Sequence, residues 1–172
     1  ISPTNQLYAV WKEDIDIVTR RSTDGGSTWN PLVNISLTPT NAQQPSLTIT
    51  PTGILRIVWV EDNDIQWSQS TDGGNFWDFP VNLSNTATVA SQNPKILFSD
   101  NITHLVWQEN TEIFYRKQIE GQALWMSAIN LSNNSGNSQM PAIAVDTTGH
   151  RHLLWGDDTP GNQEIFYNRR WK

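Results

Sequence analysis

Two series of tryptophans recur every 48 residues along the chain. The first series is Trp11, Trp59, Trp107 and Trp155, and the second is Trp29, Trp77 and Trp125. The triplet Asn-x-Ser keeps the same interval, beginning at Asn34, Asn82 and Asn130. Because three features stay in step, the sequence is a tandem repeat of a unit of about 48 residues. Tandem repetition restricts the fold to architectures in which similar units stack on one another.

Within one repeat, short runs of β-branched and aromatic residues alternate with turn residues. In the repeat that begins at Ile35, strands are expected over residues 46–50, 54–59, 64–68 and 77–82. The segments between them are rich in Pro, Gly, Asp and Asn. No stretch has the i, i+3, i+4 apolar spacing that is typical of an amphipathic helix. Four short antiparallel strands per repeat predict an all-β fold, a β-propeller with one four-stranded blade per repeat.

The register of the repeat predicts where the blades begin and end. We expect one propeller segment over residues 1–172, with complete blades at 35–82 and 83–130 and partial blades at 1–34 and 131–172. This amounts to about 3.6 repeats. An open stack of blades exposes two sheet faces. We therefore expect a partial ring that is completed by further sequence or by self-association.

Composition excludes several classes of protein. The formal net charge is −6, and no cluster of Lys and Arg is present, which argues against a nucleic-acid partner. The longest apolar run is far shorter than the roughly 20 residues of a membrane-spanning helix, so no membrane insertion is expected. The chain has no cysteine, which rules out disulfides, a thiolate nucleophile and Cys-ligated metals.

The turn between the third and fourth expected strands carries a distinctive motif. Residues 22–29 read Ser-Thr-Asp-Gly-Gly-Ser-Thr-Trp, and residues 70–77 read Ser-Thr-Asp-Gly-Gly-Asn-Phe-Trp. Both fit Ser-x-Asp-x-Gly-x-x-Trp, which resembles the Asp-box, or bacterial neuraminidase repeat, of sialidase-like β-propellers. The residues that carry the resemblance are Ser22, Asp24, Gly26, Trp29, Ser70, Asp72, Gly74 and Trp77. We expect a structural role, in which the Asp accepts N–H groups of its own turn and the Trp covers the hairpin.

The resemblance also implies what a catalytic member would need. Sialidases of this family use three Arg residues on the substrate carboxylate, a Tyr nucleophile with a Glu partner, and an Asp acid. Residues around a single catalytic site should depart from the repeat, but the candidate Tyr and Arg residues of this chain mostly recur with it. Tyr115 and Tyr167, for example, occupy the same position of the third strand. No catalytic residue is therefore assigned. The alternative is that the chain is a fragment of a sialidase-like glycoside hydrolase whose catalytic residues lie elsewhere.

Polar residues recur in the two loop series that lie on one face of such a propeller. The loops that enter each first strand carry a Gln two positions before a Pro, and the loops after each second strand begin with an acid. These residues are Gln43, Gln92, Gln139, Glu13, Glu61, Glu109 and Asp157. Amides and carboxylates beside Trp faces suit sugar hydroxyls, and repetition adds avidity. The same regularity would also result from a purely structural duty.

We therefore predict a non-catalytic binding or assembly propeller for carbohydrate or another extracellular polymer. A second alternative is an architectural propeller that holds protein subunits together. The expected partners are a glycan or protein ligand and further blades or a second copy. Low charge, many Asn and Thr residues and the family resemblance predict an extracellular, cell-surface or periplasmic location.

No cofactor or metal is predicted, with one calcium candidate. The loop that begins Asp157-Asp158 is four residues longer than its counterparts and rich in oxygen ligands, although it lacks the spacing of a known calcium loop. The three histidines, His104, His150 and His152, do not form a zinc set, and packing is the better interpretation.

Overall fold

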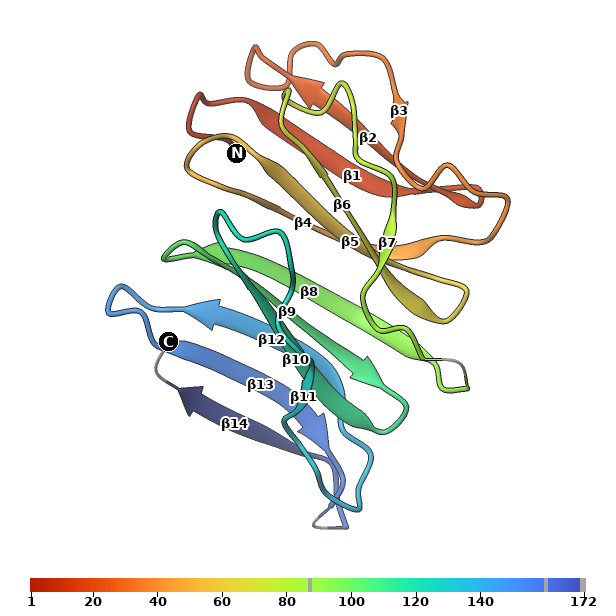
Figure 1. Ribbon diagram of the computed structural model, residues 1–172, viewed down its shortest axis with the longest axis vertical. Coiled ribbons are helices and arrows are strands. Elements are labelled where there is room, and N and C mark those ends of the chain that lie inside the picture. The colour runs from red at the N-terminus through yellow and green to blue at the C-terminus, as the bar shows by residue number, and fades with distance from the viewer. Residues whose placement is uncertain (87, 160, 171–172) are drawn as a thin grey trace. The chain divides into compact units, whose positions relative to one another are not determined.

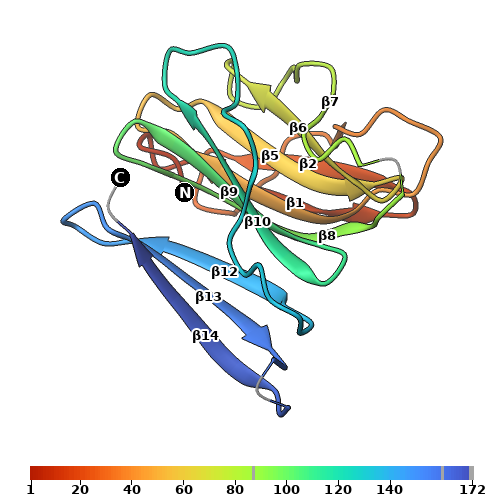
Figure 2. The ribbon, with the colours of Figure 1, turned by 60° about the horizontal axis from the view of Figure 1, so that its bottom comes forward.

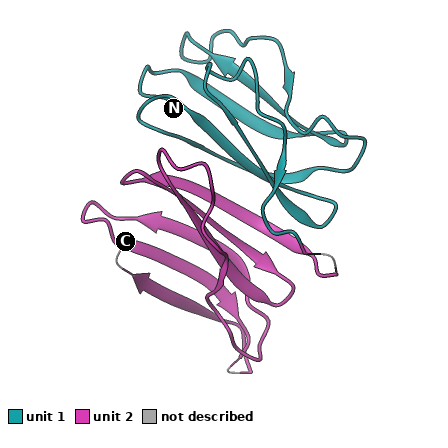
Figure 3. Cartoon of the chain, viewed as in Figure 1, with its two compact units in different colours: residues 1–85 teal, residues 86–172 magenta. Residues whose placement is uncertain are grey.

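Every regular element that the structure describes is a β-strand. The structure is a computed structural model, and it describes residues 1–86, 88–159 and 161–170 (Figure 1). The strands form four antiparallel sheets in which neighbours along the chain pair with one another. The all-β class and the division of each repeat into short antiparallel strands are thereby confirmed. The four sheets fall into two compact units, residues 1–85 and residues 86–172 (Figure 3).

The first unit holds two sheets. The first sheet consists of β1 (Leu7–Glu13), β2 (Asp16–Ser22) and β3 (Val33–Asn34). The second consists of β4 (Gln43–Ile49), β5 (Leu55–Glu61), β6 (Asp64–Ser70) and β7 (Val81–Asn82). In both sheets the strand order follows the chain.

The second unit repeats this plan. Its first sheet consists of β8 (Ser91–Ser99), β9 (Ile102–Glu109), β10 (Glu112–Ile119) and β11 (Ile129–Asn130). Its second consists of β12 (Gln139–Val145), β13 (Arg151–Asp157) and β14 (Glu164–Arg170). In this last sheet β14 is the outer strand among the described residues (Figure 2).

The outer strands β3, β7 and β11 are shorter than the sequence predicts, with two residues each. A strand was expected over residues 77–82, but β7 contains only Val81 and Asn82, which pair with Trp67 and Gln66. Pro80 has no N–H to donate to a ladder. Upstream of it, Asp78 makes one isolated backbone hydrogen bond, donating its N–H to the carbonyl of Gln69 at 2.9 Å. The segment therefore joins the sheet only after the proline.

The large tryptophans of the second strands lie in the cores, as expected of wedges between sheets. In the first unit Trp59 is fully buried in a cluster with Ile17, Ile35, Ala42 and Ile57, which come from both sheets of that unit. In the second unit Trp155 packs with Val106, Ile113 and Leu153, again from two sheets. Trp107 is also buried, whereas Trp11 is only half-buried.

The Asn-x-Ser triplets tie the outer strand to the third strand. In the first copy, the hydroxyl of Ser36 accepts the N–H of Ile17 at 3.1 Å and donates to Asp16, while the side chain of Asn34 accepts the N–H of Leu37. The second and third copies form the same bonds around Ser84 and Ser132. The repeated triplet is therefore explained by its structural role.

The turns that resemble Asp-boxes form the predicted local hydrogen bonds. Asp24 accepts the N–H and hydroxyl of Thr28 and the hydroxyl of Ser22, and these bonds, Thr28 first, lower the pKa of Asp24 to about 2. Asp72 accepts the N–H groups of Asn75 and Phe76 in the same way. The tryptophans differ from one another. Trp77 packs against the core of the first unit, but Trp29 is 40% exposed and only partly covers its hairpin.

Among the described residues, no helix is long and apolar enough to cross a membrane.

Candidate functional site

The predicted glutamines all lie at an irregularity at the start of a first strand. Gln43 pairs with Val60 and Ser46 with Val58, so two residues, Gln44 and Pro45, stand opposite Trp59 alone. This is a β-bulge, and the residue after each glutamine has positive φ, 54° at Gln44. The same shift follows Gln92 and Gln139. The three glutamines are half-buried, and their role as ligands stays a prediction.

Three of the four predicted acids, Glu61, Glu109 and Asp157, accept a hydrogen bond from a tryptophan. The indole N–H of Trp59 donates to Oε2 of Glu61 at 2.8 Å, and Thr40 donates to the other carboxylate oxygen at 2.5 Å. Trp107 donates to Glu109 at 3.0 Å in the same manner. Glu61 is 3% exposed, whereas Glu13 is exposed to solvent. The buried acids thus satisfy an indole N–H that would otherwise be left without a partner.

Asp157 is the most heavily bonded of these acids. It is fully buried and accepts hydrogen bonds from Trp155, Ser138, Asn134 and both the N–H and hydroxyl of Thr159. Burial acts to raise its pKa, but the bonds from Ser138, Thr159 and Asn134 outweigh burial and hold the pKa well below its usual range. Both oxygens are therefore already engaged in holding the loop closed.

Asp158, which follows Asp157, also forms a hydrogen bond that ties this loop to the segment before β12. Asp158 accepts the N–H of Asn137 at 2.6 Å. Among the described residues, no group of three or more His, Asp or Glu side chains is placed to hold a metal ion. Pro160, in the same loop, lies outside the described residues. Calcium binding at Asp157 and Asp158 stays a prediction.

A pocket of about 420 Å³ lies on the first unit, where the loop before β4 meets the turn after β5. Two prolines line it together with Thr38, Thr40, Glu61, Asp62, Gln66 and Phe79. We call it the Phe79 pocket. Phe79 is 86% exposed, so its ring is an open apolar surface beside polar side chains. Asp62 and Asn63 both have positive φ, as in a type I′ turn, which places Asp62 at an exposed hairpin tip.

The main residues of this pocket escaped the sequence analysis because they do not repeat. Pro31 and Ser127 stand at the positions that match Phe79, and Val18 and Phe114 at those that match Gln66. Only Glu61 of the predicted ligands lines this pocket. The signal that could have found the pocket is departure from the 48-residue pattern.

A second, more apolar pocket of about 290 Å³ lies on the last sheet. It is lined by Gln139, Met140, Leu154, Trp155, Gln163 and Ile165, with two small residues. We call it the Gln139 pocket. It contains one of the predicted glutamines, and Gln163 offers a second amide at its edge. Gln43 and Gln92 do not line either of these two pockets.

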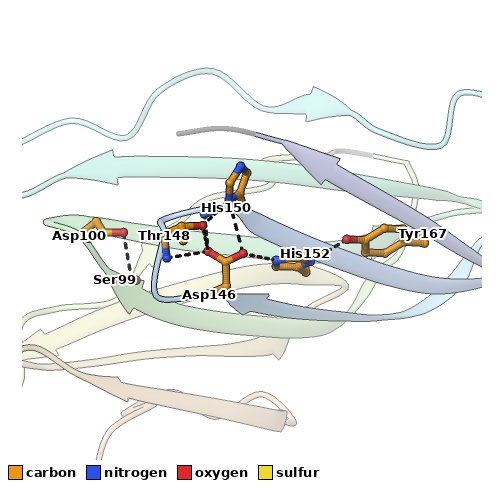
Figure 4. Close-up of polar contacts among 7 residues, drawn as sticks. All are labelled: Ser99, Asp100, Asp146, Thr148, His150, His152 and Tyr167. Carbon is orange, nitrogen blue, oxygen red and sulfur yellow. Dashed lines mark hydrogen bonds and ion pairs between the residues drawn. The ribbon is translucent and has the colours of Figure 1, made fainter.

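A third arrangement is a chain of hydrogen bonds from Asp146 through His152 to Tyr167 (Figure 4). Nε2 of His152 lies 2.9 Å from Asp146, and Nδ1 lies 2.7 Å from the hydroxyl of Tyr167. The hydroxyl of Thr148 and the ring of His152 hold the pKa of Asp146 well below its usual range. With Asp146 ionised, Nε2 carries the hydrogen and Nδ1 accepts the phenol of Tyr167. Asp146 and Tyr167 thus hold the two ring nitrogens of His152 in place.

The preceding repeat contains the same His–Tyr pair in a different setting. Nδ1 of His104 lies 2.7 Å from the hydroxyl of Tyr115, but Phe98 stands where the later repeat has Asp146. Both residues are buried, and the guanidinium of Arg151 lies 3.9 Å from the centroid of the Tyr115 ring. Burial first, and then the charges of Arg151 and Lys117, lower the pKa of His104 to about 4. This pair is a neutral core contact, as the sequence predicted for the histidines.

No protein-family model and no curated protein sequence matches this chain. Solved structures do match. The chain is similar to the α-L-arabinanase of Penicillium chrysogenum complexed with arabinobiose, with a TM-score of 0.72 and 17% identity, covering 98% of this chain and 60% of that chain. It is similar to the Hadza microbial sialidase Hz136, with a TM-score of 0.71 and 14% identity, over 97% of this chain and 42% of that one.

A further match is the intramolecular trans-sialidase from Ruminococcus gnavus, in complex with oseltamivir carboxylate. Its TM-score is 0.65 and its identity 14%, over 96% of this chain and 40% of that chain. The chain therefore spans less than two thirds of the length of these three structures. Likeness at this low identity shows the fold, which is that of β-propeller blades as found in sialidases and arabinanases.

Proposed function

We propose that this chain, which has the fold of the sialidase-like β-propellers, binds carbohydrate without cleaving it, and that the Phe79 pocket is its principal saccharide site. The observation that carries the proposal is the nearly fully exposed Phe79 ring beside the polar residues of the pocket. Single exposed apolar residues are common on protein surfaces, and what distinguishes Phe79 is the set of polar side chains gathered around its ring. The apolar face of a pyranose or furanose ring is a partner of matching size and chemistry.

Polar groups around the ring supply orientation. Asp62 is exposed and accepts hydrogen bonds, and the amide of Gln66 both donates and accepts. Thr38 and Thr40 add hydroxyls, and their side chains are hydrogen-bonded to one another at 3.2 Å. One aromatic face with several hydroxyl, amide and carboxylate groups suits a sugar better than an apolar ligand.

The carboxylates of the pocket favour binding over hydrolysis. A glycosidase of the common type needs two carboxyl groups that flank the scissile bond, whereas sialidases use a Tyr as the nucleophile, and no Tyr is among the residues that line this pocket. Glu61 lines the pocket but is buried, with one oxygen bonded to Trp59 and the other to Thr40. It is thereby committed to the fold, which leaves Asp62 as the exposed carboxylate of the pocket.

The proposal also covers where the protein acts. The chain has low charge and many Asn and Thr residues, and the solved structures that it resembles include sialidases and an arabinanase. We therefore propose an extracytoplasmic location, with carbohydrate as the ligand.

The experiment is a glycan array followed by calorimetric titration of the best ligand. Phe79→Ala should weaken binding at least tenfold, because it removes the stacking surface. Phe76→Ala is the matched control, since Phe76 is 80% exposed but does not line the pocket, and it should leave the affinity unchanged. Equal affinity in the wild type and the Phe79→Ala variant would refute the site.

The same material separates the alternatives. Release of reducing sugar or of a fluorogenic aglycone from arabinan-type or sialoside substrates would favour a fragment of a glycoside hydrolase. Co-purification of protein subunits, with no glycan bound on the array, would favour the architectural role. Triple substitution of Gln43, Gln92 and Gln139 by Ala tests the glutamine series separately from Phe79.

A further inference from the structure

A smaller pocket of about 200 Å³ lies in the first unit, where the face of the first sheet meets the turn after β6. Tyr8 and Arg21 line it from β1 and β2, and Gly73 and Gly74 line it from that turn. We call it the Arg21 pocket. The Phe79 pocket lies at the other end of β6, where Gln66 lines it. The two pockets are therefore separate sites.

The charged side chains that line the Arg21 pocket are all positive. Arg20 and Arg21 are lining residues, and no Asp or Glu is among them, although the formal net charge of the chain is −6. Among the described residues, neither arginine forms an ion pair. Asp24 and Asp72 are close along the chain, but each accepts N–H groups of its own turn. The pocket thus carries positive charge that no carboxylate neutralises by contact.

The guanidinium of Arg21 has donors to spare. Nη1 donates to the carbonyl of Gly73 at 3.0 Å, while Nε is buried and has no partner among the described residues. A buried donor without an acceptor is rare in proteins unless a water or an ion supplies one. Nε and Nη2 form one edge of the guanidinium, and two parallel N–H groups of this kind match two oxygens of a carboxylate or sulfate.

Two glycines make room for this side chain. Gly73 and Gly74 have φ of 76° and 87°, and a Cβ atom on Gly73 would lie 2.6 Å from Nη1 of Arg21. A Cβ atom on Gly74 would lie 3.5 Å from the ring of Tyr8. Tyr8 pairs directly with Arg21 across β1 and β2, so both side chains project from the same face of the sheet. The turn after β6 is therefore shaped around the Tyr8–Arg21 pair.

The Tyr8–Arg21 pair departs from the 48-residue pattern. The residues that match Tyr8 in the later repeats are Arg56, His104 and His152. Those that match Arg21 are Gln69, Lys117 and Arg169. A tyrosine paired with an arginine at these positions occurs only in the first repeat, so the shared architecture of the sheets does not require it.

We propose that the Arg21 pocket binds a single oxyanionic group, a carboxylate or a sulfate, either as a free ion or as the one charge of a small sugar. The pocket volume is several times the roughly 30 Å³ that a water molecule occupies in the liquid, which is enough for such a group. Asn30 and Asn75 also line the pocket, and their amides supply further N–H donors. The negative net charge of the chain repels a polyanion, which favours a ligand with one anionic group.

The test is an NMR titration of the 172-residue chain with sodium sulfate and, separately, with sodium acetate, at an ionic strength held constant with sodium chloride. The Nε–H resonance of Arg21 and the backbone N–H resonances of Gly73 and Gly74 should shift saturably. The expected Kd is on the order of 10 mM, as for one charge-assisted pair of hydrogen bonds.

A sugar with one carboxylate distinguishes the two sources of the anion. Saturable binding of glucuronic acid, with no binding of glucose, would support a sugar-borne group. Binding of acetate and sulfate without glucuronic acid would support a free ion. In either case the same resonances of Arg21, Gly73 and Gly74 should shift.

Variants of the arginines locate the site. Arg21→Gln should weaken sulfate binding at least tenfold, because it removes both the charge and the fork, and the second repeat already has a glutamine at this position, Gln69. Arg21→Lys keeps the charge but not the fork and should weaken binding about threefold. Arg170→Gln is the charge-matched control, since Arg170 is exposed and does not line the pocket, and it should leave the affinity unchanged.

Three results would overturn the proposal. One is a shift of the Arg21 resonance that rises linearly with sulfate and does not saturate. Another is equal sulfate affinity in the wild type and in the Arg21→Gln and Arg21→Lys variants. The third is an equal loss of affinity in Arg21→Gln and Arg170→Gln, which would show that the anion responds to net charge and not to this pocket. The wild-type titration decides the matter even if Arg21→Gln disturbs the contact with Gly73.

Discussion

Acidification should destabilise the second unit through one buried histidine, His104. The ring of His104 lies in the core, hydrogen-bonded to Tyr115, with Arg151 stacked on the tyrosine. Burial, together with the charges of Arg151 and Lys117, lowers the pKa of His104 from 6.5 to about 4, and Asp100 opposes this only in part. Protonation of His104 would place a positive charge in a core that already contains the guanidinium of Arg151.

The direction and size of the effect follow from this pKa. The unfolded chain takes up the proton near pH 6.5 and the folded chain near pH 4, so the unfolded state binds more protons between these values. Stability is therefore fully present above pH 6.5 and is lost as the pH falls toward the folded pKa. At about 1.4 kcal/mol per pKa unit, the full loss is about 3 kcal/mol, of which about 2 kcal/mol falls between about pH 7 and pH 4.5.

Urea unfolding at about pH 7 and about pH 4.5 measures the effect, with His104→Asn as the control. Asparagine keeps an amide near the position of Nδ1 but does not titrate. The Asp and Glu side chains titrate in both proteins, so their contribution cancels in the comparison. The wild type should lose about 2 kcal/mol more than the variant on acidification. Equal losses, or an NMR titration that places the His104 pKa near 6.5, would refute the reasoning.

Two further perturbations test the hydrogen bonds of the repeat. Glu61→Ala should cost about 1–3 kcal/mol in urea unfolding, because it leaves the buried indole N–H of Trp59 without its acceptor, whereas Glu13→Ala at the equivalent exposed position should cost less than about 0.5 kcal/mol. Ser84→Ala should cost about 1–2 kcal/mol, because it removes both an acceptor and a donor between two strands, while Ser135→Ala, at an exposed position, should be nearly neutral. Similar costs within either pair would contradict the assigned roles.

The fold could be predicted because its signals are local and occur several times. Alternating β-branched residues, Gly-rich turns and an unvarying 48-residue interval specify strands, and repetition cancels the ambiguity of any single copy. The exception was the outer strand. The segment before Pro80 is rich in aromatic residues, which suit a strand, but most of it lies outside the ladder. Composition alone does not reveal which N–H groups find a partner.

The acids of the predicted binding face show why sites are harder to predict. Their regular placement is compatible with a ligand, yet Glu61, Glu109 and Asp157 accept an indole N–H from a tryptophan two residues earlier. A signal for this role was present, because residues i and i+2 of a strand lie on the same face. The spacing in the sequence correctly places each acid beside its tryptophan. It does not show whether the carboxylate faces solvent or a buried N–H donor.

Departures from the repeat are therefore more informative about function than the repeat itself. His104 and His152 occupy the same position and each contacts a tyrosine, but Phe98 accompanies one pair and Asp146 the other. The cover also differs, because the guanidinium of Arg151, from the next sheet, stacks on Tyr115 in the first of these pairs. Phe79 and Gln66 depart from the pattern in the same way. In this chain the residues that the copies share maintain the sheets, as Glu61 and Ser84 do, while Phe79 and Gln66, which we propose to bind the ligand, stand at positions that the copies do not share.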